Sequence, residues 1–388
     1  MNALRWVAAA ACLVLAGCPS HAGGGGGRTR PVSPIGHLPA PEPGAPHVTW
    51  RRVMTAGDVP REPPAAGTYR IHLIDVGTGL AILVQGHDFA LLYDAGTNDR
   101  DEKPIRVLAY LAAALGPSGD DLCVEPGRRV PTGRVAIPNV VLSHPHFDHA
   151  SALDLVVHCY DVANLWDSGR VNDAVFYRDL IGAVARSPAT TYHTAIEVPA
   201  DHVQSVKGVE ATITRWERFA EGDVVPLGAG AKFTILHADG KKLPDPNQNS
   251  VVLAVQLGAE RLLLVGDAES GARRDPSEPP GDVEAFLVEQ HAPEIRADIL
   301  QVGHHGSKTS SRRGFLEAVK PALALVSSGP KVYGHTVLPD AEVIDELHRV
   351  GATVLRTDEH DGACDLPRRL GGDSGPGGCD SYIIEIAP

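Results

Sequence analysis

Short apolar runs recur along this chain and are separated by polar or glycine-rich segments. Runs that are continuously apolar, or that alternate between apolar and polar residues, are typical of buried β-strands. Longer segments with apolar residues three or four apart are typical of helices that bury one face. The strands predicted in the first half are 69–76, 80–85, 90–93, 140–142 and 164–166, and the helices are 105–115 and 152–158.

The same scheme repeats in the second half of the chain. Strands are predicted at 233–237, 251–257, 262–265, 299–302, 322–326 and 352–355, with helices at 282–289 and 340–350. Chains in which strands alternate with helices fold into sheets that are covered by helices. The predicted fold class is therefore α/β, with two sheets flanked by helices.

The amino terminus has the pattern of a secretion signal. Arg5 precedes an apolar stretch, residues 6–15, that is too short to span a bilayer as a helix. The stretch ends in Leu15-Ala16-Gly17-Cys18, which resembles the lipobox of bacterial lipoproteins. We expect residues 1–17 to be a signal peptide and Cys18 to carry lipid, which would anchor the protein on the periplasmic or extracellular face of the bacterial cell envelope. An ordinary signal peptide with a chance cysteine is the alternative.

Residues 18–66 are rich in glycine and proline and include the run from Gly23 to Gly27. This composition predicts a flexible tether with ends on the order of 40 Å apart. The remaining residues, 67–388, can bury a large core and are predicted to form one domain. No segment after the signal is both apolar and long enough to be a membrane span.

The formal net charge of −13 argues against a protein that coats nucleic acid through a broad basic face. It does not exclude a nuclease, because two divalent ions can attract phosphate locally.

Four cysteines remain after the signal and Cys18, and an exported protein can join them in two disulfides. Cys364 and Cys379 flank a loop rich in Gly, Pro and Asp and are the better-supported pair. Cys123 and Cys159 are then paired by elimination. A metal site built from cysteines is the alternative, and the cysteine spacing does not favour it.

Three histidines and an aspartate lie between His144 and His149, directly after the apolar strand 140–142. Residues that follow a buried strand lie on the loop at its end. Imidazole nitrogen and carboxylate oxygen suit borderline divalent ions, and alternate positions on a tight loop can direct His144 and His146 at one ion. Asp148 and His149 can then face a second ion. A solvated histidine-rich loop is the alternative.

Further polar clusters follow other predicted strands. An aspartate at a strand tip can bridge two ions, and histidines between glycines let the backbone approach an ion or a phosphate. One of His304 and His305 is expected to bind metal, with His304 preferred. The residues concerned are Asp267 after strand 262–265; His304, His305, Ser307 and Lys308 after strand 299–302; and His335 in a loop before helix 340–350.

Together these motifs resemble those of the metallo-β-lactamase superfamily, and within it the hydrolase domain of ComEC-type competence proteins. The resemblance runs from about Tyr69 to the end of the chain and does not include the membrane channel of competence proteins. It implies an αββα sandwich of two mixed sheets flanked by helices, with metals at one edge of the paired sheets. Its motifs are Ile74-Asp75-Val76-Gly77, Asp94-Ala95-Gly96, Ser143 to His149, Asn249-Ser250, Gly266-Asp267, His304-His305-Gly306-Ser307, Tyr333-Gly334-His335 and Arg356-Thr357-Asp358.

The resemblance also implies roles for individual residues. Zinc is the first expectation for the two divalent ions because histidine dominates the ligands, and manganese is the alternative. The implied roles are His144 and His146 for the first ion, Asp148 and His149 for the second, Asp267 as the bridge, His304 as the last ligand of the second ion, and Asp94 as the group that orients a ligand histidine.

The chain departs from the family pattern at three places. Gly77-Thr78-Gly79-Leu80 stands where such domains usually have Gly-Gln-Gly-Asp, so a polar contact beside the site is expected to be missing. Ala150-Ser151-Ala152 replaces a pair of glycines and is expected to narrow the pocket. The third histidine ligand has no clear counterpart, and His193 and His237 are the candidates.

The expected activity is metal-assisted hydrolysis, in which two ions lower the pKa of water and polarise the phosphoryl oxygen that it attacks. Asp148 could orient the nucleophile, while His335, Lys308 and Ser307 could steady the phosphate or help the leaving oxygen depart. Phosphodiesters, including DNA, are the expected substrates. One alternative is an esterase acting on small phosphoesters, lactones or β-lactams. Another is a metal-stabilised envelope protein that binds without turnover.

Overall fold

The structure is a computed structural model that describes residues 36–37, 47–98, 105–124, 133–199, 202–361 and 378–388. The predicted signal peptide, Cys18 and Cys364 lie outside the described residues. All described residues belong to one unit, which spans residues 34–388.

Among the described residues, ten strands form the first sheet. Its strand pairs are antiparallel from β1 to β5 and parallel from β5 to β11. In spatial order the strands are β1 (Gly36–His37), β2 (His47–Val53), β21 (Ser381–Ala387), β3 (Tyr69–Leu73), β4 (Ile82–Gln85), β5 (Ala90–Tyr93), β6 (Asn139–Leu142), β7 (Asn164–Asp167), β8 (Thr191–Thr194) and β11 (Trp216–Arg218).

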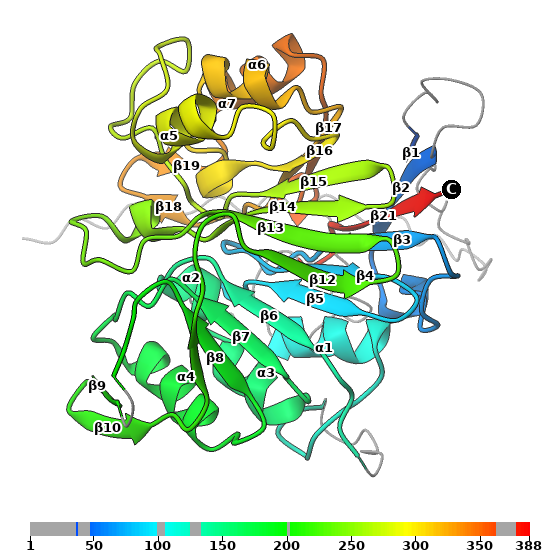
Figure 1. Ribbon diagram of the computed structural model, residues 1–388. Coiled ribbons are helices and arrows are strands. Elements are labelled where there is room, and N and C mark those ends of the chain that lie inside the picture. Colours follow the sequence, from blue (N-terminus) through cyan, green and yellow to red (C-terminus); the bar gives the residue numbers. More distant parts are fainter. Residues whose placement is uncertain (1–35, 38–46, 99–104, 125–132, 200–201, 362–377) are drawn as a thin grey trace, which may run out of the picture. The chain divides into compact units, whose positions relative to one another are not determined.

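The second sheet has seven strands among the described residues, antiparallel from β12 to β15 and parallel from β15 to β20. Both sheets are therefore mixed, and they are stacked face to face (Figure 1). In spatial order the strands are β12 (Val224–Gly228), β13 (Ala231–His237), β14 (Val252–Leu257), β15 (Glu260–Leu264), β16 (Ile299–Gln301), β17 (Leu323–Val326) and β20 (Thr353–Arg356).

Helices cover the outer face of each sheet. The first sheet is covered by α1 (Ile105–Ala114), α3 (Leu153–Cys159) and α4 (Val175–Ala185) (Figure 1). The second is covered by α5 (Asp282–Gln290), α6 (Arg313–Val319) and α7 (Ala341–Arg349). The predicted αββα sandwich of two mixed sheets is confirmed.

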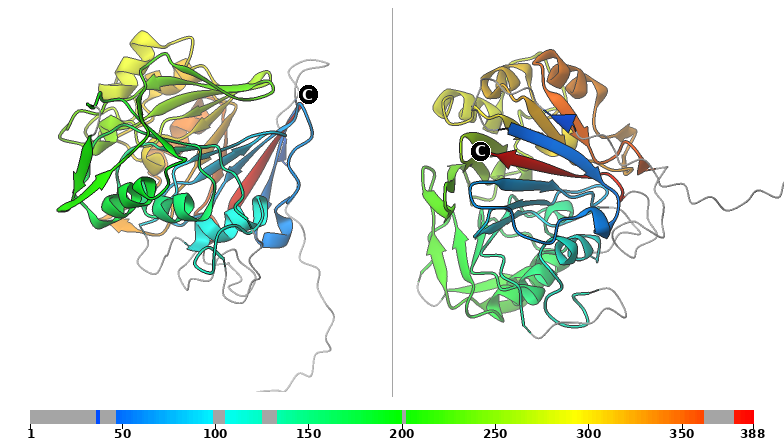
Figure 2. Two further views of the ribbon diagram at one scale, coloured as in Figure 1. Left: turned by 60° about the horizontal axis from the view of Figure 1, so that its bottom comes forward. Right: turned by 90° about the vertical axis from the view of Figure 1, so that its right-hand side faces the viewer.

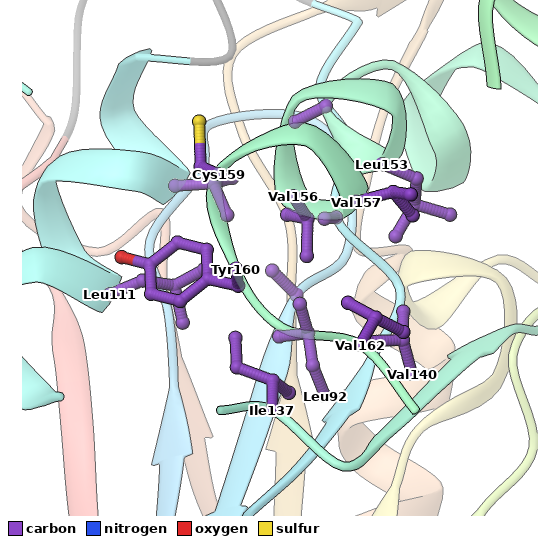
Figure 3. Close-up of a cluster of buried hydrophobic side chains, with 14 of the residues drawn as sticks. Leu92, Leu111, Ile137, Val140, Leu153, Val156, Val157, Cys159, Tyr160 and Val162 are labelled. Atoms are coloured by element: carbon purple, nitrogen blue, oxygen red, sulfur yellow. The ribbon is translucent and has the colours of Figure 1, made fainter. Parts of the chain in front are cut away.

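Alternation along the strands divides the apolar side chains among three buried layers. Leu91 lies between the two sheets, whereas the next residue, Leu92, packs against the helices of the first sheet. In the same way Leu262 lies between the sheets and Leu263 packs against the helices of the second. Figure 3 shows Leu92 in the same buried cluster as Val156 of α3. Each fully buried side chain of this size stabilises the fold by about 1.5–3 kcal/mol. Because these strands are buried on both faces, nearly every position is apolar, and the sequence of each strand is a continuous apolar run.

The folded region begins earlier than predicted. β2 pairs antiparallel with β21 from His47, opposite Ala387, to Val53, opposite Ser381. Figure 2 shows β21, in red, between the blue strands β2 and β3. The prediction that the tether continues to residue 66 is therefore wrong, because β1 and β2 belong to the first sheet. The partner of β2 lies at the other end of the chain, so no local pattern indicated the pairing.

Short elements connect the main ones. Two separate hairpins are formed by β9 (Val203–Val206) with β10 (Val209–Thr212), and by β18 (Val332–Tyr333) with β19 (Thr336–Val337). The short helices are η1 (Ala56–Asp58), α2 (Phe147–Ala150), η2 (Pro246–Asn249) and η3 (Gly303–Gly306).

Among the residues that the structure describes, every helix falls short of the length and apolar character that a membrane span requires.

A disulfide joins Cys123 to Cys159, across a sequence separation of 36 residues and with the Cα atoms 5.6 Å apart. It ties the loop after α1 to the end of α3. This pairing, predicted by elimination, is confirmed, so a metal site built from these two cysteines is excluded. Because Cys364 lies outside the described residues, its pairing with Cys379 stays a prediction.

We expect the double substitution Cys123→Ser and Cys159→Ser to lower the free energy of unfolding by about 4 kcal/mol, because a cross-link over a loop of this length restricts the unfolded chain. Urea unfolding of the oxidised wild type and of the double variant measures the difference. Equal unfolding midpoints with equal urea dependence would contradict the expectation.

Candidate metal centre

Four loops meet at one edge of the paired sheets, and each leaves the carboxyl end of a strand. Asp94 follows β5, the segment 143–149 follows β6, Asp267 lies just beyond β15, and η3 follows β16. β5 and β6 are parallel neighbours, as are β15 and β16, so their carboxyl ends lie at a common edge of each sheet. The backbone N–H of Val251 donates to the carbonyl oxygen of Ser143 at 2.8 Å and so joins the two sheets beside these loops.

Glycine at two positions lets the loops approach each other closely. Gly266 has φ of +57°, and a Cβ at this position would lie 2.6 Å from the Cβ of Ser143. A Cβ on Gly96 would lie 2.6 Å from the backbone nitrogen of His149. Any larger residue would push the loops apart, because these distances are far below van der Waals contact.

The carboxylate of Asp267 lies at the centre of the histidine cluster. The residue is only 2% exposed. Its Oδ2 lies 3.2 Å from Nε2 of His149, 3.7 Å from Nε2 of His305, 3.8 Å from Nε2 of His304 and 3.9 Å from Nε2 of His144. The fold therefore brings together residues that the sequence separates by more than a hundred positions.

Hydrogen bonds fix which ring nitrogen of His149 and His305 carries a proton. Nδ1 of His305 lies 2.9 Å from the carbonyl oxygen of Ser327, which can only accept. Nδ1 of His149 donates to Oδ2 of Asp94 at 2.8 Å. In the neutral ring, each Nε2 then presents a lone pair to the cluster.

Three buried polar atoms of the cluster lack a hydrogen-bond partner among the described residues. They are Nε2 of His149, Nε2 of His305 and Oδ1 of Asp267. A buried acceptor that meets no donor costs free energy. A cation bound between these atoms would remove that cost, so the orphaned acceptors fit a metal.

His144 and His146 form the other side of the cluster, with Nε2 of His144 3.0 Å from Nδ1 of His146. Nδ1 of His144 lies 3.0 Å from Oγ of Ser143, and this hydroxyl donates its single proton to Asp94. Nδ1 of His144 must therefore be the donor, which leaves its Nε2 as a lone pair. Two facing ring nitrogens at this distance need a proton or a cation between them.

The donors form two overlapping groups. The ligand atoms of His144, His149 and Asp267 all lie within 4.8 Å of one another, and so do those of Asp148, His149 and His305. Nε2 of His305 lies 3.5 Å from Oδ2 of Asp148. Imidazole nitrogen with carboxylate oxygen is the ligand chemistry of zinc and related divalent ions.

His304 has different partners from its neighbour His305. Its Nδ1 lies 2.5 Å from Oε1 of Glu269 and 2.7 Å from Oγ1 of Thr309. Both histidines have positive φ, 45° and 54°, a conformation that costs about 1–3 kcal/mol and is concentrated at functional sites. The sequence had not singled out Glu269, and its one signal was its position two residues after Asp267.

The carboxylates set the charge of the cluster. Burial by itself would lower the pKa of His149, but Asp267 and Asp94 raise it well above its usual value. Burial also opposes a charged His304, yet Asp267 and Glu269 raise the pKa of this histidine to about 9. Burial acts to raise the pKa of Asp267, and the surrounding imidazoles hold it well below its usual range. The cluster therefore attracts positive charge.

The structure places the residues expected to contact phosphate at varying distance from the cluster. Ser307 is buried, and its Oγ accepts from Nη1 of Arg273 at 3.0 Å. Nζ of Lys308 lies 2.7 Å from Oε1 of Glu342. His335 lies in the turn between β18 and β19. Among the described contacts, no hydrogen bond or ion pair joins Lys308 or His335 to the cluster.

The two candidates for a third histidine ligand have other partners. Nε2 of His193 lies 3.0 Å from Oδ1 of Asn164. The His193 ring stacks on the ring of Trp166, with the ring centroids 3.9 Å apart. Nδ1 of His237 donates to the carbonyl oxygen of Ser250 at 2.8 Å. Neither histidine belongs to a metal-binding group of the described residues.

Residues at two of the positions that depart from the family pattern make local hydrogen bonds. The hydroxyl of Thr78 accepts from the backbone N–H of Lys331 at 3.1 Å. The hydroxyl of Ser151 accepts from the backbone N–H of Thr97 at 3.0 Å. Both side chains therefore help to hold neighbouring loops at the edge of the site.

The chain belongs to the metallo-β-lactamase superfamily, a superfamily of metal-dependent hydrolases, and residues 74–329 match the family of that description. It is similar to Recombination protein 2 of Haemophilus influenzae, with 25% identity over 292 residues that cover 75% of this chain and 28% of that protein. It is also similar to competence protein ComA of Neisseria gonorrhoeae, with 26% identity over 312 residues that cover 80% of this chain and 34% of that protein. The predicted likeness to competence proteins is confirmed, and the chain spans about a third or less of these relatives.

The chain also matches a solved structure. The metallo-β-lactamase fold protein YhfI of Bacillus subtilis is 14% identical, with a TM-score of 0.38, and the match covers 74% of this chain and 95% of YhfI.

The metal-free protein should lose the stabilising effect of His304 as the pH rises. Because its pKa is raised from 6.5 to about 9, protonation stabilises the fold fully below pH 6.5, and the effect disappears as the pH passes 9. We expect the difference in melting temperature between chelator-treated wild type and His304→Gln to shrink between pH 6.5 and 9.5. A difference that stays constant over this range would contradict the assignment.

Proposed function

We propose that this protein is a phosphodiesterase that uses two divalent metal ions. The observation that carries the proposal is the position of Asp267, whose Oδ2 lies within 3.9 Å of imidazole nitrogens from four histidines. A purely structural ion pair needs one histidine beside a buried carboxylate. Four histidines around one carboxylate, three of them with a ring lone pair facing inward in the neutral form, are the arrangement expected for shared cations.

The proposed ligands follow the family resemblance, and the last ligand of the second ion is chosen from the geometry. His144 and His146 would hold the first ion, and Asp148 with His149 the second, while Asp267 lies between them. For the last ligand of the second ion we propose His305 rather than His304, because Nε2 of His305 is buried, lacks a hydrogen bond and faces Asp148. Asp94 would orient His149 through its hydrogen bond to Nδ1. Zinc is the expected metal and manganese the alternative.

The residues around the ions have defined tasks. When bound, the two ions would lower the pKa of water and draw charge from the phosphoryl oxygens. Burial raises the pKa of Asp148, but His305 and His149 outweigh it and hold this pKa well below the usual range, so the carboxylate stays ionised. Asp148 can therefore accept a hydrogen bond from the attacking water and orient it. His304, whose Nδ1 contacts Glu269, lines the cavity beside the cluster.

Phosphodiesters are the proposed substrates, and DNA is included because the relatives carry the names of recombination and competence proteins. A small carboxylic or phosphoric ester is the second candidate, because carboxylates outnumber lysine and arginine in the lining of the cavity beside the site. We further propose that the protein works at the bacterial cell envelope, held there by lipid on Cys18.

Asp267→Asn should abolish both metal binding and turnover. We expect kcat/KM for bis-p-nitrophenyl phosphate to fall about 100-fold or more, since losing even an outer-shell partner of a metal typically costs 10–100-fold. Metal content by mass spectrometry should fall from two ions per chain in parallel. Asp121→Asn, a matched change at an exposed position, should retain both properties. Metal-loaded wild type that hydrolyses no diester or other ester would refute the proposed activity.

His304 and His305 should differ in metal stoichiometry. We expect His305→Ala to bind one ion per chain, because the second ion would lose an inward-facing nitrogen. His304→Ala should keep two ions, because Nδ1 of that histidine is engaged by Glu269 and Thr309. Mass spectrometry of both purified variants decides between the two histidines. The opposite result would assign the second ion to His304.

A further inference from the structure

The parallel strands β15 and β16 separate from each other just before the metal cluster. Their ladder pairs Leu262 with Ile299 and Leu263 with Leu300. Beyond these pairs, the chain from β15 leads to Asp267 and the chain from β16 leads to η3. Backbone N–H and C=O groups that leave a ladder inside a protein need other partners, because a buried polar group without one destabilises the fold.

The side chain of Gln301 occupies the fork between the two strands, and the residue is only 2% exposed. Its Oε1 accepts hydrogen bonds from the backbone N–H groups of Val265 and Gly266, each at 2.8 Å. Its Nε2 donates to the carbonyl oxygens of Gly266 at 3.0 Å and of Val302 at 2.8 Å. A single amide therefore takes the place of the missing ladder and joins the two strands beyond its end.

The backbone partners of Gln301 allow its amide only one orientation. Backbone N–H groups only donate and carbonyl oxygens only accept, so the amide oxygen must face the two N–H groups and the amide nitrogen the two carbonyls. Glutamate has at most one proton to offer to the two carbonyl oxygens, and methionine, which has a similar length, offers none. The contacts therefore depend on an amide at position 301.

The segments that Gln301 joins carry central ligands of the cluster. Gly266 directly precedes Asp267, and its carbonyl oxygen also accepts from the backbone N–H of His304 at 3.3 Å. The helix η3 begins two residues after Gln301 and contains His304 and His305. The donor atoms of a metal site must be held within about 0.5 Å of their working positions. The amide thus helps to set the distance between Asp267 and His305, whose Oδ2 and Nε2 atoms are 3.7 Å apart.

The backbone on both sides of the fork needs such support. Gly266, His304 and His305 have positive φ values of 57°, 45° and 54°. For the two histidines this conformation is unfavourable, and it persists only where the surrounding contacts determine it. Gln301 supplies contacts of this kind to Gly266 and to the residue before η3.

We propose that Gln301 is a positioning residue of the metal centre, whose amide holds Asp267 and His305 at the spacing at which both can bind the same cation. It acts through the backbone of the two loops and not by binding an ion itself. The inference rests on the metal binding in the proposed function and is independent of the substrate.

Gln301→Glu tests the inference, and Gln256→Glu is its matched control. Nε2 of Gln256 also donates to two carbonyl oxygens, those of Gly258 at 2.8 Å and of Glu260 at 3.0 Å. These bonds lie in the turn from β14 to β15, at the end of β15 that is away from the cluster. The same substitution therefore removes the same kind of donor at both positions, and only position 301 adjoins the metal ligands.

We expect folded Gln301→Glu to bind zinc about tenfold more weakly than wild type, since loss of an outer-shell partner typically weakens metal binding about 10–100-fold. Gln256→Glu should bind zinc as tightly as wild type. Competition with a chromogenic chelator, well below the melting temperatures, measures the affinities. The visible spectrum of the cobalt(II)-loaded proteins reports the geometry of the ligands and should change in Gln301→Glu alone.

The two readouts separate positioning from general stability. If both variants melt at lower temperature but keep the zinc affinity and the cobalt spectrum of wild type, Gln301 supports only the fold and the proposal is overturned. Equal weakening of zinc binding by both substitutions also overturns it. If Gln301→Glu does not fold, Gln301→Met, which brings no charge into the interior, is compared with Gln256→Met by the same criteria.

Metal binding and hydrolysis are measured separately, so the two proposals can fail separately. If metal-loaded wild type leaves diesters and other esters intact, the proposed activity fails, whereas the zinc affinities of the variants still decide the role of Gln301. A wild-type protein that binds no divalent metal overturns both proposals.

Discussion

The position of His149 between two buried carboxylates is the constraint on which the rest of the site depends. Its Nδ1 donates to Asp94 of the first sheet, and its Nε2 lies 3.2 Å from Asp267 of the second. Burying two carboxylates costs several kcal/mol each unless positive charge accompanies them. Either the protonated imidazole or an ion bound at Nε2 of the neutral ring supplies that charge. The two sheets must therefore dock in a single register for the buried charges to be compensated.

The architecture provides the rigidity that such a pairing requires. Each functional loop leaves a strand that is apolar on both faces, so its starting point is fixed by packing in two layers. Gly96 and Gly266 then allow the loops to touch without a side chain between them. The cost of the strained backbone at His304 and His305 is offset by the packing of β16 before them and of α6 after them. The geometry of the donors thus follows from the sandwich rather than from the loops alone.

The sequence predicted most of the sandwich but not its edges. Strands such as 90–93 and 299–302 were found because burial on both faces leaves a continuous apolar run. β2 and β21 were missed because each depends on a partner from the opposite end of the chain. α4 was missed as well, although it contributes buried residues to the first sheet's outer layer. Long-range pairing leaves no trace in a local window, which is why propensity alone failed there.

The same reasoning explains what was predicted of the site. The His144 to His149 segment and Asp267 stood out because metal ligands after a buried strand form a recognisable pattern. The choice between His304 and His305 could not be made from spacing, since it depends on a left-handed backbone at both residues and on a carbonyl oxygen from Ser327. Glu269 and the acidic cavity wall emerged only when distant loops were seen together.

The place of β21 in the first sheet has a consequence for how the chain is made. Residues 381–387 separate β2 from β3, although both of these strands are synthesised near the beginning. While the ribosome is still at work, the nascent chain has a gap in the middle of that sheet. The first sheet cannot close until residues 381–387 are available, so β2 and β3 keep unpaired edges until then.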